Sequence, residues 1–137
     1  MIPAEMAAAH AAAFTQSRPW SQQEFESLLD SPLVFAAGDA RAFALVRVIA
    51  DEAELLTIAT GPAHQRRGLA RAVMAGWQAE ACARGAATAF LEVAADNLPA
   101  LNLYESCGFE TCGRRSGYYK RTRGKAADAL LMTRILP

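Results

Sequence analysis

The stretch Gln65-Arg66-Arg67-Gly68-Leu69-Ala70 decides the fold, because it joins a strand-like run to an amphipathic helix. The run before it, residues 53–60, has leucine and isoleucine among small residues. The run after it, residues 69–84, has helical periodicity and ends at Gly85. The first turn of a helix leaves about four backbone amides without intrahelical partners, at the positive end of the helix dipole. The junction therefore predicts an anion site, most simply for a phosphate group.

The side chains of this stretch fit such a site. Gly68 and Ala70 are small, so a phosphate can approach the main chain closely. Three arginines add positive charge around the same point: Arg66, Arg67 and Arg71. The competing interpretation is a basic, solvated helix start, which is a common feature. A P-loop is disfavoured because no Lys-Ser or Lys-Thr pair follows the glycine, and a dinucleotide fingerprint needs three glycines where this stretch has one.

The stretch also resembles the pyrophosphate loop of the GNAT acetyltransferases, Gln/Arg-x-x-Gly-x-Gly/Ala, at Gln65, Gly68 and Ala70. Other segments follow in the family's order from about Arg18 onward. They are residues 51–59, Leu91-Glu92-Val93, Asn97, Ala100, Leu103-Tyr104-Glu105 and Gly108-Phe109, while Pro19-Trp20-Ser21 with Phe25 fits the RimI-type branch of the family. The end of the chain is similar to the RimI-type branch, which acetylates the N-terminal alanine of a small-subunit ribosomal protein. The segments that carry this similarity are Arg115, Tyr118-Tyr119 and residues 128–132.

This resemblance implies a GNAT fold of the α/β (α+β) class. Helices then flank a mixed, mostly antiparallel central sheet with splayed central strands, and residues 1–137 form one domain. Family members usually begin with a short edge strand, but too few residues precede Pro19-Trp20 for it here. We expect that strand to be missing and the substrate groove to be slightly more open on that side, unless the sequence given begins late. Ala70 replaces the more common glycine, which costs little if backbone amides hold the phosphate.

Local patterns predict the remaining elements. The expected helices cover residues 4–14, 21–29, 69–84 and 97–106, and the expected strands cover residues 33–37, 42–50, 53–60, 88–94, 109–115 and 127–136. Gly38-Asp39 is expected to join the first two strands, and Ser21 with Glu24 is expected to form a capping box. The apolar stripe of the long helix is expected at Leu69, Val73, Gly76, Trp77 and Glu80.

Composition limits the functional classes. The chain carries 14 basic and 14 acidic residues, which argues against a nucleic-acid or membrane-surface role driven by net charge, so we expect no specific DNA and no membrane partner. Residues 1–6 lack the basic start of a signal peptide, and no apolar run of about 18 residues follows. The three cysteines, Cys82, Cys107 and Cys112, form no Cys-x-x-Cys pair, so a reduced, cytoplasmic location is predicted.

One local charge asymmetry remains. Residues 111–127 contain no acidic residue and six basic ones, which are Arg114, Arg115, Lys120, Arg121, Arg123 and Lys125. The usual explanation is a solvated loop. The functional alternatives are a docking surface for an acidic peptide, for nearby ribosomal RNA or for the outer phosphates of the cofactor.

The resemblance implies acetyl-CoA as the cofactor, with coenzyme A as the product. Its pantetheine arm would lie beside the strand that ends Ile58-Ala59-Thr60, and a backbone amide there, that of Ile58, would polarise the thioester carbonyl. The implied cofactor-binding residues are Ile58, Ala59, Thr60, Gln65, Arg66, Arg67, Gly68, Leu69, Ala70, Arg71, Asn97 and Tyr104.

Glu92 is the candidate general base. It interrupts the run Ala89-Phe90-Leu91-Glu92-Val93-Ala94, which otherwise suits a buried strand, and burial of an isolated carboxylate would raise its pKa toward that of a useful base. In the RimI-type branch the glutamate at this place deprotonates the incoming α-amine, by way of a water molecule. The competing interpretation is a glutamate at a strand end that accepts a hydrogen bond from a backbone amide.

Tyr104 is the candidate general acid, since the family's acid occupies this place and would reprotonate the departing sulfur. A core tyrosine with its hydroxyl at the surface is the alternative. Asn97 caps the following helix or contacts the cofactor arm. Tyr118 and Tyr119 either shape the acceptor's groove or pack within a hairpin. His10 and His64 have no spacing that suggests a metal site.

Three functional hypotheses follow. The first is transfer of an acetyl group from acetyl-CoA, in a ternary complex, to the N-terminal α-amine of a protein, with a ribosomal protein that begins with alanine as the implied acceptor. The second keeps the fold and the cofactor but has a small-molecule amine or a lysine side chain as the acceptor. The third is a non-catalytic module that binds acetyl-CoA, against which Glu92 and Tyr104 argue.

Overall fold

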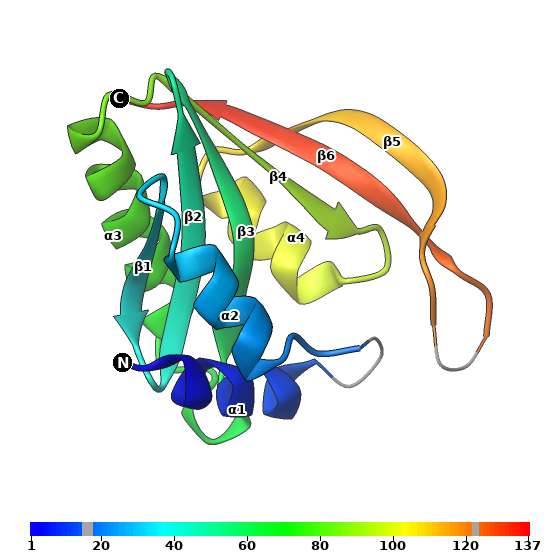
Figure 1. Ribbon diagram of the computed structural model, residues 1–137. Helices are drawn as coiled ribbons and strands as arrows, with labels where there is room; N and C mark the ends of the chain where they lie inside the picture. Colours follow the sequence, from blue (N-terminus) through cyan, green and yellow to red (C-terminus); the bar gives the residue numbers. More distant parts are fainter. Residues whose placement is uncertain (15–17, 122–123) are drawn as a thin grey trace.

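The computed structural model (Figure 1) describes residues 1–14, 18–121 and 124–137. Its helices are α1 (Pro3–Ala13), α2 (Gln22–Leu29), a 3-10 turn (Pro62–His64), α3 (Leu69–Ala83) and α4 (Leu98–Ser106). Its strands are β1 (Val34–Asp39), β2 (Ala42–Ile49), β3 (Glu52–Thr60), β4 (Thr88–Ala94), β5 (Glu110–Tyr119) and β6 (Ala127–Ile135). They form one six-stranded sheet in the order β1-β2-β3-β4-β6-β5. The predicted mixed, mostly antiparallel sheet is confirmed, because only β3 and β4 pair in parallel.

The sheet opens between β3 and β4. These strands pair only where Glu52–Glu54 lies beside Thr88–Phe90. Beyond Glu54, β3 continues to Thr60 paired with β2 alone, and Figure 1 shows β3 and β4 diverging. The backbone groups on the β4 side of this part of β3 are therefore free of strand partners, which confirms the predicted splay.

A bulge in β3 changes which face its side chains occupy. Leu55 pairs with Val46 and Thr57 pairs with Leu45, so Leu56 is an extra residue. Because side chains alternate along a strand, the extra residue moves those after it to the other face. Leu55 packs in the core beneath α3, whereas Thr57 contacts α1.

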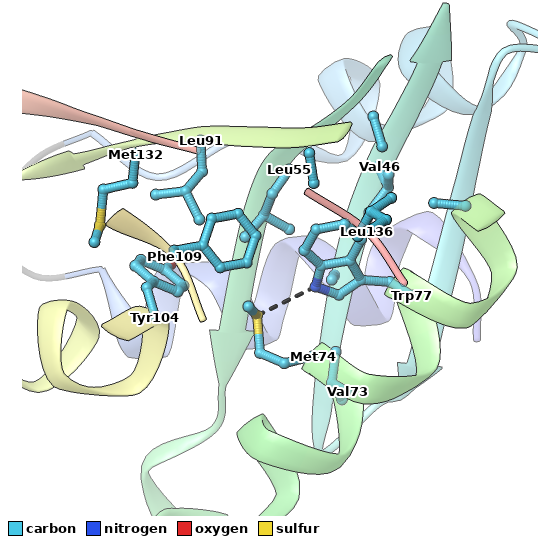
Figure 2. Packing of buried hydrophobic residues seen from close by; sticks show 14 of the residues in the cluster. Val46, Leu55, Val73, Met74, Trp77, Leu91, Tyr104, Phe109, Met132 and Leu136 are labelled. Carbon is cyan, nitrogen blue, oxygen red and sulfur yellow. Dashed lines mark hydrogen bonds between the residues drawn. The ribbon is translucent and has the colours of Figure 1, made fainter. Parts of the chain in front are cut away.

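Helices pack on both faces of the sheet, but they cover the two faces unequally. Helices α3 and α4 lie on one face, and α1 and α2 cover the other face over β1 to β3 (Figure 1). The larger core lies beneath α3 and α4, where Trp77 is fully buried and donates from its ring nitrogen to the sulfur of Met74 at 3.2 Å (Figure 2). Figure 2 also shows Tyr104 and Phe109 entering this core from the α4 side.

The smaller core, beneath α1 and α2, is organised by a buried histidine. His10 is 1% exposed, accepts a hydrogen bond at Nδ1 from the Trp20 amide at 3.0 Å, and lies 3.1 Å from the Thr57 hydroxyl through Nε2. Its ring stacks on Phe14 with centroids 3.8 Å apart. Since Nδ1 accepts, Nε2 carries the proton and donates to Thr57. Burial lowers the pKa of this imidazole to about 4.

The helix ends follow the predicted capping chemistry. The hydroxyl of Ser21 accepts from the Glu24 amide at 3.2 Å, and the Glu24 carboxylate accepts from the Ser21 amide at 3.0 Å, so the capping box is present. The side chain of Asn97 accepts from the Ala100 amide at 3.3 Å and begins α4. Gly85 adopts φ +97° after α3, as a helix-ending glycine does.

Several local predictions were wrong. In α3 the buried residues are Val73, Met74, Trp77, Gln78 and Ala81, so the expected stripe members Gly76 and Glu80 lie outside it. Strand β1 continues through Gly38-Asp39, and the turn lies at residues 40–41.

Strand β5 was expected to end at Arg115 but continues to Tyr119, because register shifts carry the pairing past the glycines. Among the described residues no strand precedes α1. Those residues also include no helix with the length and apolar character needed to cross a membrane.

Candidate active site

The predicted phosphate loop has the geometry of an anion site. Gly68 adopts φ +76° and Arg66 adopts φ +64°, which turns the chain sharply into α3. The first hydrogen bond of α3 runs from the Ala72 amide to the Gly68 carbonyl at 3.1 Å, so the amides just before Ala72 remain available. The space where a Cβ of Gly68 would point is open to 4 Å. The Gln65 side chain donates to the Thr60 carbonyl at 3.3 Å and so ties the loop to the end of β3.

Glu92 lies on the opposite face of the sheet from α3 and α4. Its neighbours Leu91 and Val93 are buried beneath those helices, and alternation along β4 places the carboxylate on the other face. The expected burial is incomplete, and the carboxylate has a charged partner. Its side chain is 24% exposed, and its Oε1 lies 3.2 Å from Nη2 of Arg115. Arg115 lies on β5, which is separated from β4 by β6 alone.

Tyr104 lies on the α4 side of the sheet. It is 6% exposed and packs edge-on against Phe109 with centroids 6.3 Å apart. Burial raises the pKa of its phenol well above the ordinary value, and the nearby Tyr119 and Cys107 raise it further. The hydroxyl therefore stays neutral throughout the physiological pH range.

Tyr119 connects these two groups. Burial raises the pKa of its phenol to about 12, and the charge of Glu92 adds to that shift. Tyr119 also acts on the pKa of Tyr104. The pKa of Tyr119 thus depends on Glu92 and that of Tyr104 on Tyr119, although the three residues come from β4, β5 and α4. Tyr118 is 51% exposed and meets the Tyr119 ring edge-on at 5.1 Å.

The basic segment is less uniformly charged than its sequence suggests. Three of its arginines pair with carboxylates from other elements, namely Arg114 with Asp128 at 2.7 Å, Arg115 with Glu92 at 3.2 Å and Arg121 with Asp96 at 2.7 Å. Arg114 and Arg115 also lie in β5 rather than in a loop. Arg123 lies outside the described residues.

Sequence patterns missed two features of this region. Arg115 is the cationic neighbour of Glu92, and its guanidinium also lies 5.1 Å from the Tyr118 ring. His10 links α1 to β3 one residue before Ile58. The one sequence signal for a buried His10 ring is Phe14, which follows it four residues later and therefore lies on the same side of the helix. Across the described ranges, no three His, Cys, Asp or Glu side chains gather in an arrangement that could hold a metal ion.

Comparison with known proteins agrees with this geometry. The family described as "Acetyltransferase (GNAT) family" matches residues 4–109. The chain belongs to the GNAT acetyltransferases. It is 42% identical over 119 residues to the [ribosomal protein bS18]-alanine N-acetyltransferase of Escherichia coli strain K12, covering 83% of this chain and 79% of that protein. The crystal structure of the Escherichia coli ribosomal-protein-S18-alanine N-acetyltransferase superposes with a TM-score of 0.88 at 35% identity, covering 98% of this chain and 87% of that one.

A functionally different relative is the streptothricin acetyltransferase of Streptomyces lavendulae. It is 35% identical over 106 residues, which cover 76% of this chain and 56% of that protein. GNAT acetyltransferases use acetyl-CoA, so this GNAT chain is an acetyl-CoA-dependent N-acetyltransferase. The open amides at Gly68 and the unpaired edge of β3 fit the phosphates and the amide-containing arm of that molecule.

Proposed function

We propose that this GNAT chain acetylates the N-terminal α-amine of a protein, with a small-subunit ribosomal protein that begins with alanine as the acceptor. The observation that carries the proposal is the opening between β3 and β4, with Glu92 on β4 beyond Phe90, the last residue of β4 that pairs with β3. Glu92 reaches the opening from one face of the sheet and Tyr104 from the other. An amine and a thioester that entered from opposite faces would therefore meet between them.

Backbone groups would hold the acetyl donor. Amides of residues 68–71 would bind its pyrophosphate at the start of α3, with Arg66, Arg67 and Arg71 around it and Gln65 and Leu69 shaping the loop. Ile58, Ala59 and Thr60 would bind its arm along the free edge of β3, and the Ile58 amide would stabilise the developing oxyanion. Asn97 caps α4 through its side-chain oxygen, and its side-chain NH2 group would donate to the cofactor arm. Acetyl-CoA supplies the activated acetyl group.

Glu92 would accept the proton of the acceptor amine. An α-amine has a pKa of about 8 and a lysine amine one of about 10.4, so a single carboxylate deprotonates the former more readily near neutral pH. Arg115 lies 3.2 Å from Oε1 of Glu92 through Nη2, and the partly exposed carboxylate would accept the proton directly or through a bridging water. Tyr118 and Tyr119 would line the acceptor's path.

Tyr104 would donate to the departing sulfur. A thiol has a pKa of about 8.5, so full proton transfer from a buried phenol is uphill. We therefore expect Tyr104 to act mainly by donating a hydrogen bond, which contributes less than a full general acid does.

The test is acetylation of a peptide that begins with alanine, followed by mass spectrometry and kinetics. We expect one acetyl group on the α-amine. Glu92→Gln should lower kcat about 100-fold and Tyr104→Phe about 10-fold, while thermal stabilisation by coenzyme A stays unchanged. Glu105→Gln, an exposed glutamate on α4, is the matched control and should leave kcat unchanged. Full activity of Glu92→Gln would remove that residue from the mechanism.

A second candidate acceptor is a small-molecule amine, which the similarity to a streptothricin acetyltransferase favours. Competition between the peptide, free lysine and streptothricin distinguishes the two. If the enzyme acetylates lysine or streptothricin faster than the peptide at equal concentration, the physiological acceptor is a small-molecule amine.

A further inference from the structure

The face of the sheet that carries Glu92 continues beyond it as a surface that no helix of the described residues covers. Residues paired across neighbouring strands share a face. Glu92 lies opposite Leu131, Phe90 lies opposite Thr133, and Thr88 lies opposite Ile135. Figure 1 shows α1 and α2 over β1 to β3 on this side, while β4 and β6 have no helix in front of them. We call these six residues of β4 and β6 the open sheet face.

This face exposes apolar side chains. Ile135 is 81% exposed. Ile49, which is 54% exposed, belongs to the same row across the strands, because Ile49 pairs with Glu52, Glu52 with Thr88 and Thr88 with Ile135. Phe90 and Leu131 are partly exposed as well. This row lies at the end of four strands, and an isoleucine at such exposure contributes little to folding, because its apolar surface remains in water.

The rim of the face is acidic. Glu52 and Glu54 border it on β3, and Glu110, opposite Thr133, borders it on β5. Glu54 is paired with Arg47 at 2.7 Å. Glu52 and Glu110 are exposed and make no ion pair with another described residue. A complementary surface would therefore combine apolar and basic side chains.

The open sheet face is continuous with the proposed site. Leu131, opposite Glu92, and Ile135 lie four residues apart on β6, which is about 13 Å at roughly 3.3 Å per residue. An extended acceptor chain with its amine at Glu92 would reach Ile135 with its residues about four to six. A second copy of the same face is disfavoured, because it would bring unpaired glutamates together.

We propose that the open sheet face is a docking surface for the acceptor protein itself, and that it binds an apolar and basic segment a few residues after the acetylated amine. The proposal rests on the proposed function, because it places the acceptor's amine at Glu92. Contacts outside the reacting centre would then select among proteins with similar first residues, which a site for the amine alone cannot do.

The experiment compares two acceptor peptides that share their first four residues, Ala first. One is a tetrapeptide, and the other is a dodecapeptide in which Leu and Arg alternate from residue five. Wild-type protein should give at least a 10-fold higher kcat/KM for the dodecapeptide, and the advantage should shrink as salt rises. Ile135→Lys should reduce the kcat/KM advantage of the dodecapeptide at least 5-fold. It should leave kcat/KM for the tetrapeptide within 2-fold of the wild-type value.

The matched control is Leu98→Lys. Leu98 is 64% exposed at the start of α4, outside the open sheet face, so the same change of size and charge there should alter neither peptide's kinetics. Equal kcat/KM for the two peptides in wild-type protein would overturn the proposal. A fall for both peptides in Ile135→Lys would also overturn it, and so would a wild-type dimer that Ile135→Lys converts to a monomer.

A binding measurement separates this proposal from the proposed function. The N-terminally acetylated dodecapeptide has no amine to acetylate, and its binding can be followed by fluorescence polarisation. Binding that weakens at least 5-fold in Ile135→Lys, but not in Leu98→Lys, supports docking even where α-amine transfer fails. Binding that is equally strong in all three proteins would contradict docking even where transfer succeeds.

Discussion

The two halves of the sheet differ in how they are covered. Strands β1 to β3 lie between α3 on one face and α1 with α2 on the other, and five consecutive residues of β2, Ala42 to Val46, are buried. In the part of the chain that the structure describes, strands β4, β6 and β5 have a helix layer on one face only, and most of β5 is exposed. The first half fixes the phosphate loop and the free edge of β3, and the second half presents Glu92 and its neighbours to an acceptor. Substitutions should therefore affect stability mainly in the first half and activity mainly in the second.

The largest effect expected is on stability in the first half. Phe43 is fully buried on β2 and packs edge-on against Phe25 with centroids 5.7 Å apart. Phe43→Ala should lower the free energy of unfolding by about 4 kcal/mol, because it leaves a cavity in the core. Tyr118→Ala, at an exposed ring of the second half, should cost less than about 1 kcal/mol. Urea denaturation measures both, and equal losses would erase the distinction between the halves.

Acid should weaken the first half through His10. The pKa of this buried imidazole is lowered from 6.5 to about 4, so the unfolded chain binds a proton more readily than the folded one between these values. The contribution is fully present above pH 6.5 and is lost as the pH falls through about 4, which amounts to about 3 kcal/mol. Glu24 opposes this shift and Arg18 adds to it.

The measurement is denaturation at several pH values between 4 and 7, which covers both the unfolded pKa of His10, 6.5, and the folded one, about 4. His10→Gln has no titrating ring, so its free energy of unfolding should change less over this range than that of the wild-type protein. The same pH dependence in both proteins would show that another group is responsible.

The smallest expected effect separates two neighbouring arginines of the second half. Arg114 and Arg115 are each 60% exposed, and their carboxylate partners Asp128 and Glu92 are 27% and 24% exposed. Arg114→Gln and Arg115→Gln should each change stability by less than about 1 kcal/mol, as exposed ion pairs do. Only Arg115→Gln should lower kcat, about 3-fold, because it alone contacts the proposed base. Equal kcat values would mean that Arg115 does not position Glu92.

Much of the fold could be predicted because its signals are local. Gly85 and Asn97 mark helix ends by their own chemistry, and the loop at Gly68 is defined by adjacent residues. The buried stripe of α3 includes Met74 and Ala81, which repeat at helical spacing with Trp77, and not the predicted Gly76 and Glu80.

The missed features depend on pairing between distant segments. Arg115 reaches Glu92 only because β6 lies between β4 and β5, and no pattern within either segment indicates that order. His10 is buried because Trp20, Phe14 and Phe25 close around it, whereas its own alanine-rich helix has no marked apolar stripe. The roles of Glu92 and Tyr104 remain predictions from the family resemblance, which the enzyme assays above test.

The short pairing between β3 and β4 has a mechanical consequence. Three residues of each strand hold the two leaves of the sheet together along their common border. A donor molecule seated along the unpaired length of β3 would act as a tie across that border. Its binding should slow amide hydrogen exchange in both leaves, well beyond the residues that it touches.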